Sequence, residues 1–445
     1  MPKERPHIPP EIWIIIFNNL RPASLPLTAI CNDVVACSLV CTEWHAEVLP
    51  LIGKELTTLD LTSTPLTDLC RLHSLLLESQ KMRLDYASLI TTLFLDLTIM
   101  IPLRHGWERT HVPSAEDTVV SFLSTACPFS TLRLDFRNLQ VPSQFDEPLA
   151  LFWLRIGPLC AEVAHLELWG TPLWPLYNSR LADLLGSLTN LREVSFEDFQ
   201  PNPLLPHELV VRTPPHTSPP QQRPPLASIR FRYHGLIDVP YISYLLLFFP
   251  RLKSLQLDGT VYPDNHTVDT LVEALLVSCP LLEELTLPSE KHSGTAKYSF
   301  DAIASTNARM AQLVVRCAGL RRLDVSGNAR LGDRFLEALA GGGGNLESLY
   351  LRQCAGIRGG SIREVTWPKL EMFDVAGCEA VDPRFVELVV RSCPVLRDVR
   401  VPMGIVGEGS VVATVLDGAG FVKVSVPRKD WCSYFRRTGV RGMWG

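Results

Sequence analysis

Residues 320–401 repeat one short pattern four times, as Leu320-x-x-Leu323-x-Val325, Leu346-x-x-Leu349-x-Leu351, Leu370-x-x-Phe373-x-Val375 and Leu396-x-x-Val399-x-Val401. The four stretches begin 26, 24 and 26 residues apart. Within each stretch, apolar residues alternate with variable ones, which predicts a short strand with one buried face. Because so short a strand cannot bury its apolar side alone, successive repeats are expected to stack into a parallel sheet over a continuous core.

The same pattern continues toward the N-terminus with looser spacings of 26 to 39 residues. Eight further triplets fit it: Leu282/Leu285/Leu287, Leu252/Leu255/Leu257, Leu226/Ile229/Phe231, Leu191/Val194/Phe196, Val163/Leu166/Leu168, Phe129/Leu132/Leu134, Ile90/Leu93/Leu95 and Leu56/Leu59/Leu61. Helical patterns occupy several of the intervening stretches, at residues 117–127, 180–188, 269–278, 334–340 and 385–392. The predicted fold class is therefore an α/β solenoid, a horseshoe with parallel strands on its concave side and helices on its convex side.

The ninth residue of each regular repeat, counted from the first leucine, is Asn328, Cys354 or Cys378. Asparagine can hydrogen-bond the backbone where it turns after a strand, and cysteine is small and readily buried. With this position, the stretch Leu320–Val401 resembles the cysteine-containing subclass of leucine-rich repeats. The alternative for the cysteines is a redox or metal cluster, but none of the 12 forms a C-x-x-C pair, so no metal or cofactor is expected.

Composition narrows the class of protein further. The chain has 445 residues and a net charge of only −5, which gives no general attraction to nucleic acid or to a membrane surface. Its apolar runs are too short for a signal peptide or a transmembrane span. We therefore expect a reducing compartment, the cytoplasm or the nucleus, and free thiols. No catalytic motif stands out, so the chain is predicted to be a binding protein and not an enzyme.

The N-terminal segment contains two apolar, helix-compatible stretches, Ile8–Leu20 and Val34–Trp44. Proline is tolerated at a helix start, and Glu11 in the first turn favours the positive end of the helix dipole. Two short helices cannot build an independent core, so they require the solenoid, a partner protein, or both.

Residues 6–51 resemble an F-box. The opening of that family corresponds to Ile8-Pro9-Pro10-Glu11-Ile12, and its later half-motif to Val40-Cys41-Thr42-Glu43-Trp44. The resemblance implies docking on the Skp adaptor of a cullin–RING ubiquitin ligase of the SCF type, with an unknown protein substrate held by the repeats. It implies these adaptor-binding residues: Ile8, Pro9, Pro10, Glu11, Ile12, Ile16, Phe17, Leu20, Val40, Cys41 and Trp44. The alternative is that the two helices only cap a leucine-rich-repeat scaffold.

Three further segments complete the predicted organisation. The solenoid covers residues 52–402 and carries a Pro-rich insertion at about 201–225, which is either a tolerated loop or an interaction motif. Residues 403–445 are predicted to form a C-terminal cap, with Ser410–Leu416 and Phe421–Val426 as its elements, and a basic tail. The tail combines arginines with Trp431 and Phe435, and a solvated terminus is favoured over a nucleic-acid contact.

The concave sheet is the usual binding face of a solenoid. Residues between the apolar strand positions, and the next outward position, are expected to point there. Those predicted to contact a protein substrate are Trp169, Arg230, Arg232, Asp324, Tyr350, Arg352, Asp374 and Arg400. Tyrosine, tryptophan and arginine dominate the binding energy of many interfaces, so a mixed-charge groove for a protein is predicted.

Overall fold

The structure of the protein is a computed structural model. It describes residues 57–62, 64–83, 86–97, 115–137, 152, 154–170, 172–173, 184–185, 187–197, 200–201, 225–236, 239–261, 267–290, 300–407, 409–424 and 432–438. The chain divides into two compact units, with the boundary between Val194 and Ser195. The F-box-like segment, with all its predicted adaptor-binding residues, and residues 202–224 of the Pro-rich insertion lie outside the described residues.

The first unit contains four parallel strands in chain order. They are β1 (Thr58–Leu61), β2 (Thr92–Asp96), β3 (Thr131–Asp135) and β4 (His165–Trp169), and a short β5 (Pro172–Leu173) follows. Leu59 pairs in register with Leu93, Leu93 with Leu132, and Leu132 with Leu166, so equivalent leucines stack into one buried row. The register predicted from the loosely spaced N-terminal triplets is therefore confirmed.

Among the described residues, two named α-helices and two named 3₁₀ turns lie between these strands. They are α4 (Leu66–Lys81), η1 (Tyr86–Leu89), α5 (Ala115–Ala126) and η4 (Pro158–Cys160). Helix α4 begins directly after Pro65, whose backbone is extended, and buries Leu69, Leu72 and Leu76 on one face. Because these leucines recur at helical spacing, α4 packs on the strands while its other face stays polar.

The second unit continues the same architecture with more repeats. Its strand order is β6-β8-β9-β10-β12-β13-β14-β15-β17-β16. The bounds are β6 (Glu193–Glu197), β7 (Gln200–Pro201), β8 (Ser228–Leu236), β9 (Ser254–Val261), β10 (Glu284–Thr286), β11 (Ser289–Glu290), β12 (Arg322–Asp324), β13 (Ser348–Tyr350), β14 (Met372–Asp374), β15 (Asp398–Pro402), β16 (Phe421–Val424) and β17 (Cys432–Arg437). The helices are α8 (Val239–Leu246), α9 (Thr267–Ser278), α10 (Phe300–Arg316), α11 (Asp333–Gly342), α12 (Pro383–Ser392), η7 (Met403–Ile405) and α13 (Val411–Gly418).

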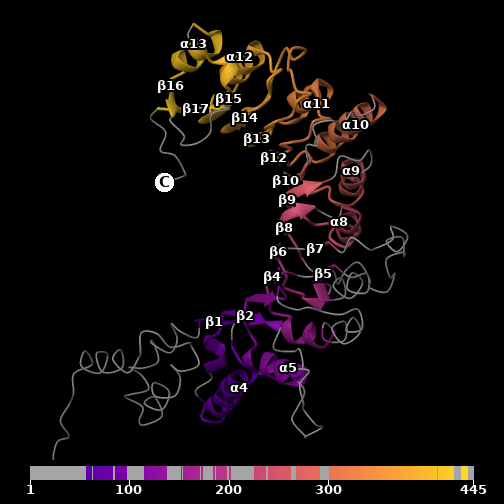
Figure 1. The fold of residues 1–445 in the computed structure, drawn as a ribbon, viewed down its shortest axis with the longest axis vertical. Coiled ribbons are helices and arrows are strands. Elements are labelled where there is room, and N and C mark those ends of the chain that lie inside the picture. The colour runs from indigo at the N-terminus through magenta and orange to yellow at the C-terminus, as the bar shows by residue number, and fades with distance from the viewer. Residues whose placement is uncertain are drawn as a thin grey trace, which may run out of the picture. The chain divides into compact units, whose positions relative to one another are not determined.

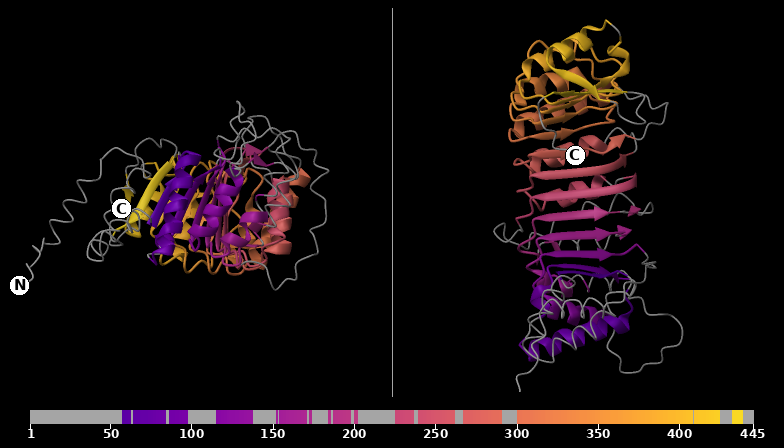
Figure 2. Two further views of the ribbon diagram at one scale, coloured as in Figure 1. Left: turned by 90° about the horizontal axis from the view of Figure 1, so that it is seen from below. Right: turned by 90° about the vertical axis from the view of Figure 1, so that its left-hand side faces the viewer.

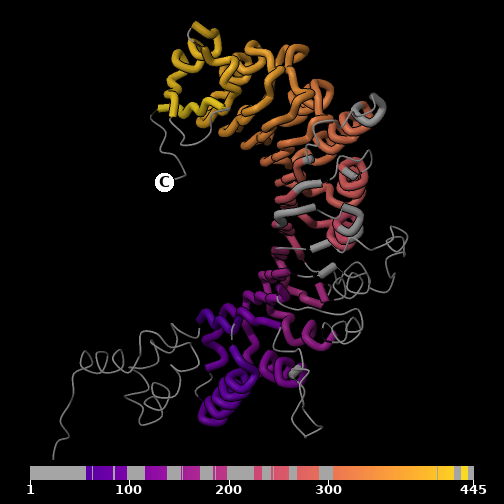
Figure 3. The backbone as a smooth tube through the Cα atoms, viewed as in Figure 1, coloured from indigo at the N-terminus to yellow at the C-terminus, as the bar shows by residue number. Residues whose placement is uncertain are grey.

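Within the second unit the strands lie on one side and helices α8 to α12 on the other (Figure 1). Figure 2 shows the strands of this unit stacked side by side. Figure 3 shows how the backbone passes from each strand to the opposite side of the unit and back. The strands β8 to β15 pair in parallel, so each repeat contacts mainly its neighbours. The predicted α/β solenoid of leucine-rich-repeat type is the observed fold.

One repeat replaces its helix with a tryptophan. Between β13 and β14, where the spacing is only 24 residues, the chain forms bends and turns and no helix. Trp367 is fully buried there, and its Nε1 donates a hydrogen bond to the Leu339 carbonyl of α11, 2.9 Å away. Together with the buried side chains of Ile357, Ile362 and Val365, this ring covers the core where other repeats use a helix.

The chain turns sharply after β12, β13 and β14 through the eighth residue of each repeat. Gly327, Gln353 and Gly377 all have positive φ, at 77°, 55° and 74°. Glycine adopts this left-handed conformation at no steric cost, which explains its use in two of the three repeats. Gln353 has a side chain at the position where the two other repeats have glycine. A side chain at Gly377 would also be crowded, because its Cβ would lie only 3.0 Å from Gln353 Cγ.

The C-terminal cap differs from its prediction in one respect. Helix α13 and strand β16 correspond to the two expected elements, but residues 432–437 form β17 and are not a solvated terminus. β17 runs antiparallel to β15 and pairs Arg400 with Tyr434 and Asp398 with Arg436. The last parallel strand would otherwise expose an open edge, and an antiparallel strand covers it. Among the described helices, none has the length and apolar character needed to cross a membrane.

Candidate protein-interaction face

Strands β12 to β15 bring four of the predicted contact residues into one row. Their pairing aligns Asp324 with Tyr350, Tyr350 with Asp374, and Asp374 with Arg400. These residues alternate along each strand with buried apolar ones such as Leu349. The alternation that predicts the strands therefore also places these residues on the sheet face opposite the core.

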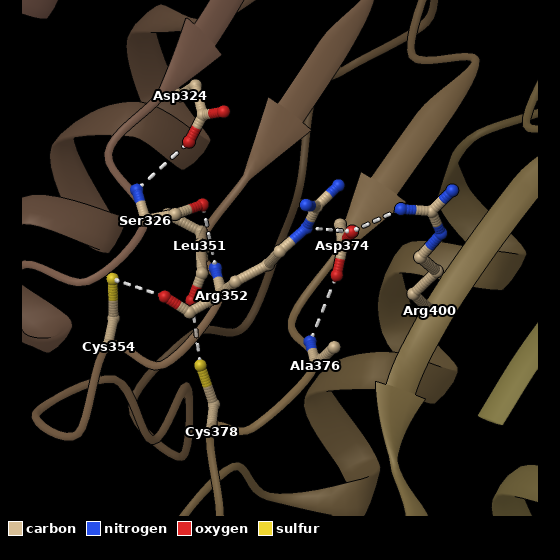
Figure 4. A network of polar contacts seen from close by, with 9 residues as sticks. All are labelled: Asp324, Ser326, Leu351, Arg352, Cys354, Asp374, Ala376, Cys378 and Arg400. Carbon is tan, nitrogen blue, oxygen red and sulfur yellow. Dashed lines mark hydrogen bonds and ion pairs between the residues drawn. The ribbon is translucent and has the colours of Figure 1, made fainter. Parts of the chain in front are cut away.

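Asp374 lies at the centre of this row and is fully buried, with 0% of its side chain exposed (Figure 4). Its Oδ1 accepts a hydrogen bond from the Ala376 amide at 3.1 Å. Its Oδ2 accepts one from Arg352 Nε at 2.5 Å and one from Arg400 Nη1 at 3.3 Å. Asp374 thus has no surface to offer a partner, and its part in the face is to orient two arginines.

Arg352 keeps its charge in this setting. Burial lowers the pKa of Arg352, but the charge and the hydrogen bond of Asp374 outweigh burial and raise that pKa above its ordinary value. Arg352 and Arg400 keep 31% and 27% of their side chains exposed. The result is a pair of cationic groups that the buried Asp374 carboxylate holds in place, with part of each arginine side chain exposed to solvent.

Two tyrosine rings extend the row on either side. Tyr350 has the guanidinium of Arg322 5.4 Å and that of Arg352 5.3 Å from its ring centroid. Both distances are within the range of cation–π attraction. The same arrangement recurs around Tyr434, where Arg400 lies 5.1 Å and Arg436 5.4 Å from the centroid.

Asp398 completes the row at its far end. Its Oδ1 accepts hydrogen bonds from the Tyr434 hydroxyl at 2.5 Å and from Arg436 Nε at 2.9 Å. An unbroken line of contacts therefore crosses β12, β13, β14, β15 and β17. We call it the arginine–tyrosine row and define it by these residues: Arg322, Tyr350, Arg352, Asp374, Arg400, Tyr434, Arg436 and Asp398.

Four residues of the row were not predicted from the sequence: Arg322, Asp398, Tyr434 and Arg436. Tyr434 and Arg436 belong to the segment that was predicted to be a basic tail. They alternate along β17 with Ser433 and Phe435, and Ser433, Tyr434 and Phe435 are all buried, whereas Arg436 is partly exposed. Alternation over six residues is too short to reveal an antiparallel partner that lies 36 to 38 residues away in the sequence.

The predicted residues Arg230 and Arg232 occupy another part of the second unit. Arg230 Nε donates to Gln256 Oε1 at 2.8 Å, and Arg232 lies 3.5 Å from Glu197 and 3.8 Å from Asp258. Strands β9 and β10 separate them from the arginine–tyrosine row. The structure thus does not bring these two arginines together with Tyr350.

Trp169 belongs to a separate cluster on the first unit. The Arg133 guanidinium lies 3.4 Å and the Arg137 guanidinium 4.6 Å from its ring centroid, so the indole is flanked by two cations. Its Nε1 donates to Glu167 at 3.3 Å. Burial raises the pKa of Asp135, but the hydrogen bonds and charge of Arg137 outweigh it and hold that pKa below its usual range.

The cysteines are used for packing. The nine described ones are free, and six of them are fully buried. Cys354 Sγ donates to the Val325 carbonyl at 3.3 Å. Cys378 Sγ donates to the Leu351 carbonyl at 2.8 Å (Figure 4). Burial raises the pKa of Cys378 to about 12, so this thiol stays protonated. In the described part of the chain, no three His, Cys, Asp or Glu side chains are grouped to hold a metal ion.

Comparison with known proteins adds two distant structures. No protein-family model and no curated protein matches the chain. A chain of the Rad7–Elc1 complex of yeast is similar over 87% of this chain and 87% of its own, at 16% identity and a TM-score of 0.39. The leucine-rich-repeat-containing protein LegL7 from Legionella pneumophila is similar over 76% of this chain and 93% of its own, at 13% identity and a TM-score of 0.35. At such scores neither likeness carries a functional argument.

Proposed function

We propose that the protein is the substrate-recognition subunit of an SCF-type cullin–RING ubiquitin ligase. The observation that carries the proposal is the pair of F-box half-motifs, Ile8–Ile12 and Val40–Trp44, in the family's order and ahead of a repeat solenoid. In this proposal the N-terminal segment docks the Skp adaptor and the solenoid captures a protein substrate. The protein is not an enzyme; it raises the substrate's concentration beside a ubiquitin-carrying partner.

The arginine–tyrosine row supports the second half of this proposal. It offers arginine and tyrosine side chains, the types that dominate binding energy at protein interfaces, on a sheet face that the unit's helices leave uncovered (Figure 1). Free cysteine thiols suit a reducing compartment, and we propose the cytoplasm or the nucleus as the site of action.

The decisive experiment is a pull-down of purified Skp adaptor by the full chain. A variant with Pro9, Ile12 and Phe17 changed to alanine should lose the adaptor, while its circular dichroism stays that of the parent chain. The matched control changes three apolar residues between the half-motifs to alanine, Leu25, Leu27 and Ile30, and should keep the adaptor. Failure of the parent chain to bind would remove the ligase role.

The alternative function is a leucine-rich-repeat scaffold with no part in ubiquitin transfer, in which residues 8–44 only cap the solenoid. It predicts no adaptor binding by either chain and a loss of solenoid stability in the triple variant. Substrate capture is tested separately with alanine at Tyr350 and Arg352 together. Unchanged capture of a co-purifying protein by that variant would contradict our placement of the binding face.

A further inference from the structure

The arginine–tyrosine row separates its charges by depth. Its carboxylates are the less exposed groups: Asp374 has 0% and Asp398 14% of its side chain exposed. Asp324, which is half-buried, aligns with Tyr350 at the edge of the row. Its guanidinium groups are the accessible ones, with 32% of the Arg436 side chain exposed and Arg322 exposed as a whole residue. The whole chain carries a net charge of −5, so a cationic face at this place is a local feature and not a reflection of composition.

The buried carboxylates also restrict how the arginines can move. Asp374 binds Arg352 and Arg400 through one oxygen atom (Figure 4). Asp398 binds Arg436 and the Tyr434 hydroxyl in the same way. The guanidinium carbons of Arg352 and Arg400 also lie over the rings of Tyr350 and Tyr434, 5.3 Å and 5.1 Å from the ring centroids. An arginine that is fixed before binding loses less side-chain entropy when a ligand arrives, which favours affinity.

The row has the dimensions of a peptide site. It crosses five neighbouring strands, β12, β13, β14, β15 and β17, and adjacent strands lie about 4.8 Å apart. The row is therefore about 19 Å long, the length of roughly six residues of extended chain at about 3.3 Å per residue. Guanidinium groups occur along this whole length, with rings between them.

We infer that the arginine–tyrosine row binds an acidic, extended segment of a partner protein. Aspartate or glutamate side chains of that segment would accept hydrogen bonds from the exposed edges of Arg322, Arg352, Arg400 and Arg436, because planar guanidinium groups match carboxylates in geometry as well as charge. Aliphatic carbons of the segment would pack on the Tyr350 ring. This inference rests on the proposed function in one respect: it takes the partner protein to be the substrate that the solenoid captures.

The test uses the purified full chain without adaptor, so that its result is independent of ligase assembly. Three fluorescein-labelled peptides of about eight residues alternate serine with glutamate, glutamine or lysine, and binding is followed by fluorescence anisotropy. The glutamate peptide should bind at least about tenfold more tightly than the glutamine peptide, the lysine peptide should not bind, and salt should weaken binding. Equal binding of the glutamate and glutamine peptides would overturn the inference.

Substitutions then locate the binding. Arg322→Gln and Arg400→Gln should each weaken the glutamate peptide about fivefold to tenfold. The matched control is Arg334→Gln, an exposed arginine in the first turn of α11 on the helical side, and it should leave binding unchanged. Equal losses in all three variants would show non-specific attraction and would contradict the inference.

Asp374→Asn distinguishes fixed arginines from net charge. The variant removes one negative charge, so simple electrostatic attraction predicts tighter binding of the acidic peptide. If Asp374 instead orients the guanidinium groups of Arg352 and Arg400, its loss should weaken binding of the acidic peptide, and this is the result we expect. Because Asp374 is buried, thermal unfolding is measured alongside, and Arg322→Gln, a surface change, keeps the test valid if Asp374→Asn does not fold.

A final arm replaces the peptide with a single-stranded oligonucleotide, which is also anionic and could stack on tyrosine. Binding of the oligonucleotide that is tighter than that of the glutamate peptide, and lost in Arg322→Gln, would overturn the inference in favour of nucleic acid. Weak oligonucleotide binding that Arg322→Gln leaves unchanged supports the acidic segment.

Discussion

The two units of the molecule use the ninth position of the repeat in opposite ways. The ninth residue of the β12, β13 and β14 repeats is Asn328, Cys354 or Cys378, and each is buried and donates to a backbone carbonyl. The ninth residue of the β3 repeat in the first unit is Arg137, whose side chain is 43% exposed and pairs with Asp135.

The length of the strand explains the difference. β12, β13 and β14 have three residues each, whereas β3 has five. β3 ends at Asp135, two residues before its ninth position, whereas β12 ends at Asp324, four residues before Asn328. The ninth residue of the β3 repeat therefore lies next to the strand end and not inside the turn, and its side chain is partly exposed. The comparison teaches that the two units share a core pattern but close their turns with different interactions, one buried and one at the surface.

The largest effect is expected where the units are alike. Leu349→Ala in the second unit and Leu132→Ala in the first should each lower the free energy of unfolding by about 2–5 kcal/mol, because both leucines are buried in stacked rows. Urea unfolding measures this, with Leu281→Ala, a leucine that is 54% exposed, as the control. A cost below about 1 kcal/mol for Leu132→Ala would mean that the first unit lacks a comparable core.

The turns should differ in what they contribute to stability. Asn328→Ala is expected to lower the free energy of unfolding by about 1–3 kcal/mol. It removes a buried side-chain amide that donates a hydrogen bond to the Val325 carbonyl at 2.9 Å. Asn345→Ala is the matched control: its amide also donates to a backbone carbonyl, at 3.0 Å, but at an exposed site. Thermal unfolding that shows equal losses for the two variants would contradict the argument.

The buried thiols give the second unit a pH dependence. Burial raises the pKa of Cys378 from an ordinary value of 9.0 to about 12. Below pH 9 the thiol is protonated in both states, and above it only the unfolded chain ionises, so stability should fall as pH rises. Between pH 8 and 10 the parent chain should lose about 1 kcal/mol more than Cys378→Ala, by denaturant unfolding. Identical slopes for the two chains would exclude this contribution.

The smallest effect is expected at the surface turn. Arg137→Gln should change the free energy of unfolding by less than about 1 kcal/mol, because the Arg137 side chain is 43% exposed and salt screens its charge. Asp135 is buried, but it keeps a hydrogen bond from the backbone amide of residue 137. A loss as large as that of Asn328→Ala, measured under the same conditions, would show that exposure does not separate the two kinds of turn.

The strand register was predictable because its cause is local. The described residues of every apolar triplet found in the sequence lie at a strand, including the irregular triplets from Leu59 to Phe196. Each short strand can bury its apolar face only against the next repeat. The helix missing between β13 and β14 was not predicted, because a buried tryptophan can replace a helix without any change in the strand pattern.

The interaction face was predictable only in part. Strand alternation placed Tyr350, Arg352 and Arg400 on the correct face, but it treated Asp374 as equally available. Burial of that carboxylate depends on two arginines from neighbouring repeats that close over it. Alternation describes which side a residue takes, whereas depth on that side depends on the neighbours' side chains.

The sequence by itself determined the repeat period, the strand positions, the apolar core and the F-box resemblance, because each follows from residues close together in the chain. Tertiary structure alone decided which charges are buried, how β17 closes the sheet edge, and how Tyr434 and Arg436 join a row that begins at Arg322. These features depend on contacts between segments far apart in the sequence, and no local periodicity encodes such contacts.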